Sequence, residues 1–372
     1  MKKKVIRVSA VPESLYTLLD GQLKFLSKYY EVIALSSKSK LLEDLAKKED
    51  IKRTIGINIE RRISLFKDIQ SLIKLILVFR KEKPAMVHSI TPKAGLLSML
   101  AAKFSNVPVR VHTFTGLVFP TSTGLKRKIL ILTDKLTCWA ATDIIPEGEG
   151  VMNDLEKFKI TSKPLKIIAN GNVNGINTSY FKIRDERKVT NNRFTFCFIG
   201  RLVGDKGINE LVTAFVNLYK LRPNIELVLV GPFEKELDPI HPEVEHLIFN
   251  HPAIKFKGFQ KDVRPFLANA DVFVFPSYRE GFPNVVLQAG AMGLPSIVTD
   301  INGSNEIISD GVNGKIIPSK DADALLHMMR HFVDHPLEVE QMASDARDLI
   351  VKRYEQHIVW EALLAEYQKL LN

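Results

Sequence analysis

Strand-like and helix-like segments alternate along almost the whole of this 372-residue chain. Strand-forming runs at 5–11, 31–36 and 86–90 are separated by segments with helical apolar spacing, such as 15–29 and 63–79. This alternation is typical of α/β proteins, in which helices join the strands of a parallel sheet. The rest of the first half continues the pattern, with a helix expected at 95–104 and strands at 109–113, 143–146 and 165–168.

The same pattern starts again after Arg187. The polar run 170–179, which is rich in Asn and Gly, predicts a segment that crosses between two domains. Beyond it the sequence predicts strands at 194–199, 225–230, 254–258, 272–275 and 296–299, and helices at 207–219 and 337–371.

The length of the chain also favours two domains, because a single core of this size would be unusual. We predict a first domain at 1–173, a second at 174–350, and a last helix within 351–372 that crosses back to the first domain. Each domain would be a doubly wound α/β unit. In such units the ligand crevice lies at the carboxyl ends of the strands.

The sequence contains no apolar stretch of the roughly 20 residues that a membrane span needs. The longest candidate, 72–79, is interrupted by Lys74. The N-terminal lysines resemble the start of a signal peptide, but the apolar run behind them ends at Arg7, which favours a first strand. We therefore expect a cytoplasmic protein.

The charge is divided unevenly between the two halves. Residues 1–180 carry a net charge of +14, whereas residues 181–372 carry −4. A basic half suggests an anionic partner, which the sequence leaves open between nucleic acid, a membrane surface and a phosphorylated acceptor. Since no nucleic-acid-binding module is recognisable, we expect no nucleic-acid partner.

A loop with two cations follows the expected strand 194–199. Gly200 permits a turn, and Arg201 and Lys206 lie five residues apart before a helix that begins near Gly207. Backbone N–H groups at the start of a helix, together with these two cations, suit a diphosphate without a metal. An ordinary surface turn would have the same composition.

A second loop, which follows the expected strand 272–275, contains Glu280, and Gly281 next to it allows close backbone approach to a ligand. Pro283 stands where a helix can begin, and Gln288 would lie in its first turns. A carboxylate and an amide near a diphosphate can hydrogen-bond sugar and ribose hydroxyls. The alternative is a helix cap with an exposed glutamate.

Together the two loops resemble the donor site of retaining glycosyltransferases of family 4, which have the GT-B fold of two Rossmann-like domains facing across a cleft. The matching residues are Gly200-Arg201, Lys206-Gly207 and Glu280-Gly281-Phe282-Pro283. The resemblance implies that Arg201 and Lys206 hold the diphosphate and that Glu280 binds donor-sugar hydroxyls. It also implies that the backbone at Phe282, Pro283 and Asn284 contacts sugar and phosphate.

The chain departs from the family pattern at three positions, and the first is Pro12-Glu13-Ser14, which stands where many relatives have a Gly-Gly pair after the first strand. Gln288 stands where the family has a second acidic residue, which binds ribose, so charge-assisted acceptance is lost there. Thr115 stands where many relatives have a histidine that contacts the donor sugar, while His112 lies three residues upstream. Which of the two faces the donor stays open, and a structural role for His112 is the alternative.

The first half resembles enzymes that build capsule, O-antigen or lipid-linked glycans. The residues that carry this resemblance are Val11-Pro12-Glu13-Ser14-Leu15 and Thr91-Pro92-Lys93-Ala94-Gly95. We therefore expect Ser14, Thr91 and Lys93 on the acceptor side. The resemblance implies transfer with retention from a nucleotide-sugar donor, expected to carry UDP, to a glycan or polyprenyl-linked acceptor of a bacterial surface polysaccharide.

Two other functions stay open at this point: a nucleotide-sugar epimerase of the same fold, and a catalytically silent subunit that binds a nucleotide sugar or a partner. No cofactor or metal is expected, because helix capping explains the Asp321-Ala322-Asp323 signature and Pro336 disfavours a zinc site of His327, His331 and His335.

Basic residues also precede apolar helical segments in the first half. Lys126-Arg127-Lys128 comes directly before 129–132, and Arg61-Arg62 precedes the helix that contains Leu65 and Phe66. This combination suits peripheral attachment to the anionic inner face of the plasma membrane. Ordinary packing of the apolar faces is the alternative.

Overall fold

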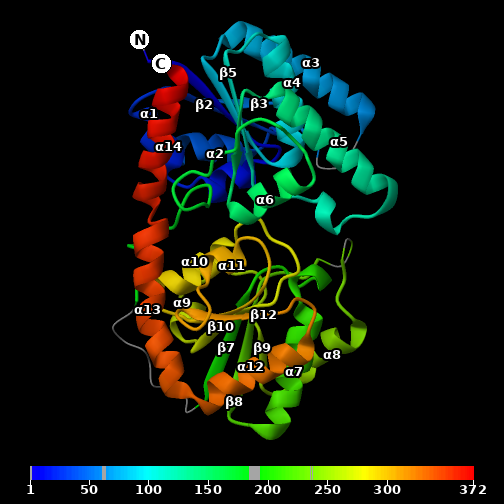
Figure 1. Cartoon of the computed structure of the whole chain (residues 1–372), viewed down its shortest axis with the longest axis vertical. Coiled ribbons are helices and arrows are strands. Elements are labelled where there is room, and N and C mark those ends of the chain that lie inside the picture. Colours follow the sequence, from blue (N-terminus) through cyan, green and yellow to red (C-terminus); the bar gives the residue numbers. More distant parts are fainter. Residues whose placement is uncertain (1, 61–63, 184–192, 235, 237) are drawn as a thin grey trace. The chain divides into compact units, whose positions relative to one another are not determined.

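The computed structural model describes residues 2–60, 64–183, 193–234, 236 and 238–372. The chain forms two compact units (Figure 1). The first consists of Met1–Gly175 together with Gln356–Asn372, and the second of Ile176–Glu355. Arg61, Arg62 and Ile63, which the sequence analysis singled out, lie outside the described residues. No described helix is both long enough and apolar enough to cross a membrane.

Within its described residues the first unit has one six-stranded parallel sheet, in the order β3-β2-β1-β4-β5-β6. The chain adds strands on one side of β1, then returns to β4 on its other side. This reversal makes the junction of β1 and β4 a topological switch point. The strands are β1 (Lys4–Val8), β2 (Glu31–Ser36), β3 (Arg53–Gly56), β4 (Met86–Ile90), β5 (Val109–Phe114) and β6 (Asp143–Pro146).

Helices cover both faces of this sheet. Successive side chains of a strand point to opposite faces, so these apolar strands present apolar side chains on both faces, and both must be covered. Ile6 and Val8 belong to one apolar cluster and Val5 to the other. The first cluster is closed by α3 (Leu65–Glu82), α4 (Pro92–Phe104), α5 (Gly124–Ala140) and α6 (Glu149–Lys157). The second is closed by α1 (Gln22–Ser27), α2 (Lys40–Lys48) and α14 (Gln356–Leu371).

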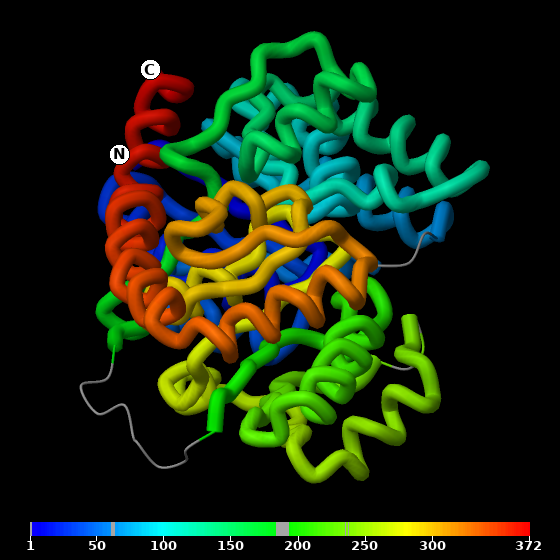
Figure 2. Tube along the Cα trace, turned by 60° about the horizontal axis from the view of Figure 1, so that its bottom comes forward, coloured from blue at the N-terminus to red at the C-terminus, as the bar shows by residue number. Residues whose placement is uncertain are grey.

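The last helix, α14, packs into the first unit beside the first strand. The red C-terminal helix runs beside the blue N-terminal segment in Figures 1 and 2, and Lys3 Nζ donates a hydrogen bond to the carbonyl of Leu371. Tyr367 is completely buried in the second apolar cluster. The C-terminal helix is therefore part of the core of the first unit.

The second unit repeats the same topology in its described residues, with the six-stranded parallel sheet β12-β11-β10-β7-β8-β9. Its switch point is the junction of β7 and β10. The strands are β7 (Phe194–Ile199), β8 (Ile225–Val230), β9 (Ile254–Phe256), β10 (Val272–Phe275), β11 (Ser296–Thr299) and β12 (Gly314–Ile317). The helices are α7 (Ile208–Leu221), α8 (Pro242–Asn250), α9 (Arg264–Ala268), α10 (Asn284–Ala291), α11 (Ser304–Ile307), α12 (Ala322–Asp334) and α13 (Pro336–Tyr354).

The expected helix 15–29 is wrong as a single element. A short π-helical turn, η1 (Ser14–Leu18), is separated from α1 by Gly21, which has a φ of +78°. A Cβ at Gly21 would lie 2.7 Å from Cη2 of Trp360 on α14. The chain therefore turns at this glycine so that α14 can pack closely against it.

Two further expectations are corrected. The expected strand 165–168 is reduced to one isolated bridge, between Ile144 and Leu165. The expected helix 337–371 is two helices, because Glu355 takes an extended backbone conformation (ψ 135°) between α13 and α14. The structure thus changes from the second unit back to the first at this residue.

We predict that Gly21→Ala destabilises the chain more than Gly124→Ala. Both glycines have a left-handed backbone, so each substitution should cost about 1 kcal/mol for the strained backbone. Only at Gly21 does the new methyl group meet Trp360, whereas nothing lies within 4 Å at Gly124. Overpacking should add about 1–3 kcal/mol. Urea denaturation of both variants measures the difference, and equal losses would contradict the close packing of α14.

Candidate functional site

The two loops singled out from the sequence meet at the switch point of the second unit. β7 and β10 are neighbouring parallel strands, with Phe196 opposite Val272 and Cys197 opposite Phe273. Their carboxyl ends therefore lie side by side, and the loop that begins at Gly200 runs next to the loop that begins at Pro276. Open parallel sheets bind ligands at this position.

An ion pair connects the two loops directly. Lys206 Nζ donates a hydrogen bond to Oε1 of Glu280, and both side chains are mostly buried, at 14% and 17% exposed. The hydroxyl of Ser277 donates to the same carboxylate oxygen at 2.8 Å, and Ser277 is fully buried. The ammonium also lies 5.5 Å from the centre of the Phe275 ring. The cation and the carboxylate are thus held together at the end of the sheet.

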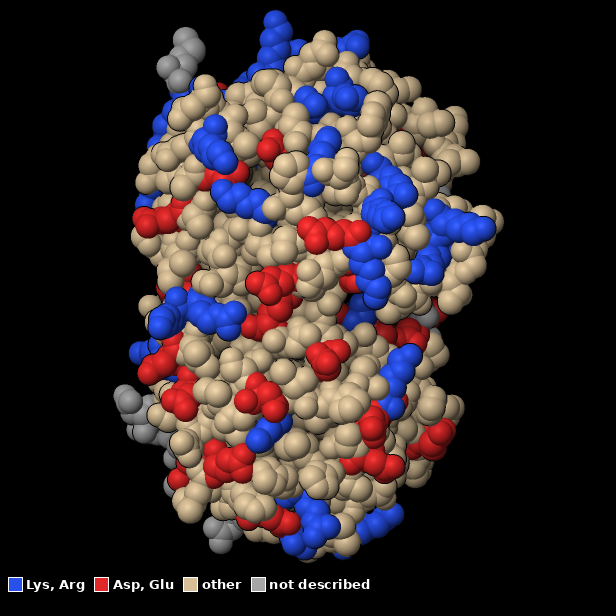
Figure 3. Space-filling model, in the orientation of Figure 1, with Lys and Arg blue, Asp and Glu red and all other residues tan. Residues whose placement is uncertain are grey.

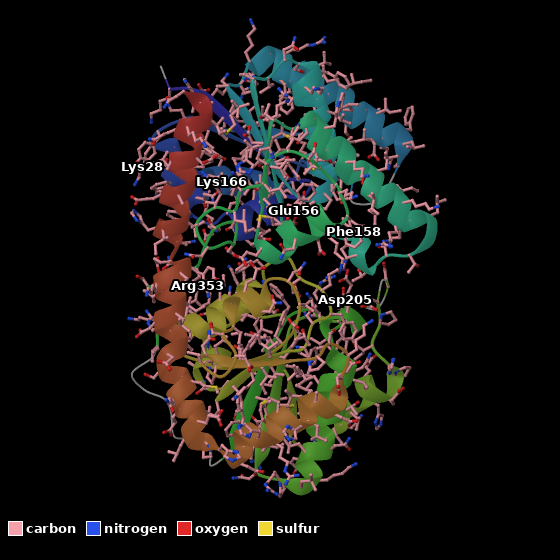
Figure 4. All side chains as sticks on the ribbon, in the orientation of Figure 1. Lys28, Glu156, Phe158, Lys166, Asp205 and Arg353 are labelled. Carbon is pink, nitrogen blue, oxygen red and sulfur yellow. The ribbon has the colours of Figure 1, made fainter. Side chains whose placement is uncertain are left out.

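Asp205, the residue before this lysine (labelled in Figure 4), connects the same two loops through its backbone and its side chain. Its carbonyl accepts from the backbone N–H of Tyr278 at 2.8 Å, and its carboxylate lies 3.1 Å from Nη2 of Arg279. Its own N–H donates to the carboxylate of Asp238 at 2.6 Å. Roles for Asp205, Asp238 and Arg279 were not predicted from the sequence, because single charged residues in loops form no recognisable motif.

The close approach of the loops depends on Gly207, the N-cap residue of α7. Gly207 has a φ of +69°, and a Cβ there would lie 2.1 Å from the carbonyl oxygen of Pro276. Any larger residue would separate the first turn of α7 from the β10 loop. The N-terminus of α7, with its unpaired N–H groups, therefore lies directly beside the Lys206–Glu280 pair.

Arg201 comes from the same loop as Lys206 but does not join that pair. Its guanidinium is half exposed and forms an ion pair with Glu234, which follows β8. Sequence reasoning missed Glu234, although the Gly231-Pro232 turn before it marks the carboxyl end of a strand. Arg201 and Lys206 therefore lie on two sides of the β7 loop, each paired with a carboxylate.

The β10 loop leads into α10, whose first residue is Asn284 and whose N-cap is Pro283. Phe282 is buried and its ring packs edge-on against Tyr354, with centroids 5.5 Å apart. Gln288 lies one turn after Asn284, so both side chains are on the same helix face, and both are partly exposed. The anchored Phe282 fixes Gly281 and the start of α10.

The expected acceptor-side residues gather at the switch point of the first unit, where β1 and β4 are paired. Ser14 begins η1 after β1, and Thr91 and Lys93 follow β4. The hydroxyl of Thr91 accepts from the N–H of Ala10 at 3.2 Å, and Lys93 Nζ lies 2.7 Å from Oδ1 of Asp68. The candidate residues of each unit thus lie at the same topological position in the two sheets.

His112 is enclosed in the first unit, with 1% of its surface exposed. Its Nδ1 is hydrogen-bonded to the hydroxyl of Ser89 at 2.8 Å, and its ring packs edge-on against Phe114. Burial lowers the pKa of His112 to about 3, so the ring is neutral at physiological pH. This environment favours the structural role for His112 and leaves Thr115, which is partly exposed after β5, as the accessible residue of the two.

A buried polar network around Arg7 of β1 was not predicted from the sequence. Arg7 is fully buried, and its Nη1 donates to Nδ1 of His88 at 2.6 Å and to the hydroxyl of Tyr367. Because arginine can only donate, Nδ1 of His88 is the acceptor, and Nε2 donates to Thr113 at 2.7 Å. Desolvation lowers the pKa of His88 well below its usual value. The network joins β1, β4, β5 and α14.

Each half of the chain matches a known glycosyltransferase family. Residues 7–147 match the family described as "Glycosyl transferase 4-like", and residues 179–349 match "Glycosyl transferases group 1". The capsular polysaccharide biosynthesis glycosyltransferase CapM of Staphylococcus aureus is 31% identical over 100% of this chain and 98% of its own length. The UDP-Gal:alpha-D-GlcNAc-diphosphoundecaprenol alpha-1,3-galactosyltransferase of Escherichia coli is 30% identical over 79% of this chain and 78% of its own.

A solved structure has the same fold at low sequence identity. The crystal structure of Anabaena HepE in complex with UDP superposes with a TM-score of 0.81 at 17% identity, covering 99% of this chain and 100% of its own. The S. aureus protein matches this chain from end to end, and each half of the chain matches a family of glycosyltransferases. This chain therefore belongs to the family 4-like, group 1 glycosyltransferases, which have the GT-B fold.

Proposed function

We propose that this glycosyltransferase moves a sugar from a nucleotide-diphosphate donor, with UDP as the expected carrier, to a glycan or lipid-linked acceptor in bacterial surface polysaccharide synthesis. The observation that carries this proposal is the Lys206–Glu280 pair between the β7 and β10 loops. It combines a cation suited to a diphosphate with a carboxylate suited to sugar hydroxyls. The names of the relatives, which include a capsule enzyme and a UDP-galactose-dependent enzyme, support it.

In this proposal the donor's diphosphate replaces the carboxylates as the partner of the two cations. A diphosphate would take Lys206 from Glu280 and Arg201 from Glu234, so that both cations bind phosphate oxygens. Glu280, still oriented by Ser277, would then accept hydrogen bonds from the sugar. The N–H groups at the starts of α7 and α10 would add positive potential, and Gln288 would bind ribose hydroxyls through its amide.

The chemical role of these groups is to stabilise the leaving group. As the bond between the anomeric carbon and the diphosphate breaks, negative charge grows on the phosphate oxygens, where Lys206 and Arg201 can offset it. The acceptor hydroxyl would form the new bond on the face that the diphosphate leaves and would pass its proton to the departing phosphate oxygen, so that the anomeric configuration is retained. Since the two side chains supply the positive charge, we expect no metal requirement.

The acceptor would bind to the first unit, with Ser14, Thr91 and Lys93 near the β1–β4 switch point. Thr115 would take the position that a histidine has in many relatives. A lipid-linked acceptor would place the enzyme at the cytoplasmic face of the plasma membrane. The E. coli relative is named for an acceptor of this type, a diphosphoundecaprenol-linked sugar.

An assay of transfer tests this function. Thermal shifts across UDP-, GDP-, TDP- and ADP-sugars identify the donor, because a ligand of the folded state raises the melting temperature. We expect a UDP-sugar to give the largest shift, and product to form only with an acceptor, with retained anomeric configuration by NMR and unchanged rate in EDTA. Product without acceptor would indicate an epimerase, and binding without any turnover a silent subunit.

We predict that Lys206→Ala and Arg201→Ala each lower kcat by at least about a hundredfold, the usual loss when one transition-state charge partner is removed. The matched control is Lys220→Ala, because Lys220 is an exposed lysine of α7 outside the candidate site, with Nζ donating to Oδ1 of Asn217 at 3.2 Å. Steady-state rates measured at saturating donor provide the comparison. Wild-type turnover in both variants would refute the assignment of the diphosphate site.

We predict that Gln288→Glu strengthens binding of the nucleotide about three- to tenfold, because a carboxylate accepts ribose hydroxyl hydrogen bonds more strongly than an amide does. Gln288→Ala should weaken binding by a similar factor. Isothermal titration calorimetry with the free nucleoside diphosphate measures both. If neither substitution changes the dissociation constant, Gln288 does not contact the ribose.

A further inference from the structure

Helix α3 exposes a complete row of large apolar side chains. Leu65, Ile69, Ile73 and Leu77 are spaced four residues apart and are all more than half exposed, and Phe66 lies beside them. Two residues along a helix differ by about 200°, so Ile73 and Leu77 lie opposite the buried Leu75 and Phe79. The helix is therefore apolar both on its core side and on its solvent side.

Helix α5 repeats this feature. Its exposed row is Leu125, Ile129, Leu132, Leu136 and Trp139, spaced alternately by four and three residues. This spacing keeps all five on one line along the helix. Leu136 lies opposite Asp134 and Cys138, which are buried. The row thus points away from the sheet that α5 covers.

These two rows form one surface of the first unit, here called the α3/α5 face. The helices lie on either side of α4 and cover the same side of the sheet (Figure 1). Of the twenty large apolar side chains that are exposed among the described residues, ten belong to the two rows and an eleventh, Phe104, to α4. Scattered apolar residues are normal on a surface, but such a concentration indicates a binding surface.

The exposed charged residues of the α3/α5 face are basic. Lys126, Lys128 and Lys135 are exposed on α5, and Lys74 and Lys81 on α3. The acidic residues of both helices are withdrawn from this surface: Asp68 pairs with Lys93, Glu82 is buried between Lys4 and Arg53, and Asp134 is buried. Figure 3 shows Lys and Arg side chains gathered on the right of the first unit, over α5.

We infer that the α3/α5 face docks on the surface of a bilayer that contains anionic phospholipids. This inference rests on the proposed function, because a lipid-linked acceptor would require contact with a membrane. The apolar rows would enter the boundary between headgroups and acyl chains, while the lysines would contact lipid phosphates. Trp139, whose ring lies 4.3 Å from Nζ of Lys103, has the amphipathic character of residues at a membrane interface.

The charge of the face decides between a bilayer and a second copy of this chain. A symmetric dimer through this surface would bring the lysines of α5 near those of its partner, with no exposed carboxylate on α3 or α5 to offset them. An anionic bilayer satisfies both the apolar rows and the lysines. Arg127 is not counted among the lipid-binding cations, because it is engaged with the ring of Phe158 on the protein, at 5.2 Å.

Co-sedimentation of the full chain with vesicles tests this inference. Vesicles of phosphatidylcholine with about one third phosphatidylglycerol should bind the chain at least about tenfold more tightly than pure phosphatidylcholine, with an affinity that falls as salt is raised. The double variant Leu77→Glu, Leu132→Glu should lose at least about tenfold in affinity, and so should the triple variant in which Lys126, Lys128 and Lys135 become Gln.

The matched control is Leu337→Glu on α13, a leucine outside the face that is even more exposed than Leu77 and Leu132, and this variant should bind vesicles like the wild type. Wild-type binding by the Leu77→Glu, Leu132→Glu variant would overturn the inference. A different outcome would assign the face to a second copy of the chain. In that outcome the wild type does not bind vesicles but forms a dimer in analytical ultracentrifugation, and the variant loses the dimer.

Nucleotide binding by calorimetry separates this test from that of the proposed function. The face variants should bind the donor nucleotide like the wild type, since α3 and α5 belong to the first unit and the Lys206–Glu280 pair to the second. Absence of vesicle binding with intact nucleotide binding refutes only the membrane surface. Vesicle binding without any nucleotide binding refutes only the donor site.

Discussion

The parallel pairing of β7 with β10 is the constraint on which the candidate site depends. Because the chain builds β8 and β9 on one side of β7 and then returns to start β10 on the other, two loops that are about 75 residues apart in sequence share one edge of the sheet. Lys206 and Glu280 meet there, and Asp205 holds the loops together through Tyr278 and Arg279. The site is a consequence of the strand order.

The Lys206–Glu280 pair also keeps two charged groups of the candidate site in fixed positions. Each group is mostly buried, and a buried charge without a partner is costly. Pairing satisfies both while keeping them where a diphosphate and a sugar would bind, and Ser277 keeps the carboxylate in place. The donor would thus enter a site whose charges are already desolvated and positioned, which reduces the reorganisation needed for catalysis.

The first unit combines the same topology with a different surface. Its interior is fixed by the network of Arg7, His88 and Tyr367, through which the C-terminal helix becomes part of the core. Its outer helices α3 and α5 are apolar on both sides and basic around the exposed rows. A core around β1 and β4 and an amphipathic exterior together suit a domain that takes an acceptor from a membrane surface.

The sequence by itself determined most strands, such as 31–36 and 194–199, because buried parallel strands are short apolar runs with clear ends. It also determined the residue types of the donor loops. The edge strands β3 and β12 were missed, since they are short and partly exposed, and the break at Gly21 was missed because only the packing of Trp360 requires it. Only the tertiary structure decided that Lys206 pairs with Glu280, that Arg201 pairs with Glu234 and that His112 is buried. The neighbours of these side chains come from segments that are distant in sequence. The local sequence pattern therefore carries no information about them.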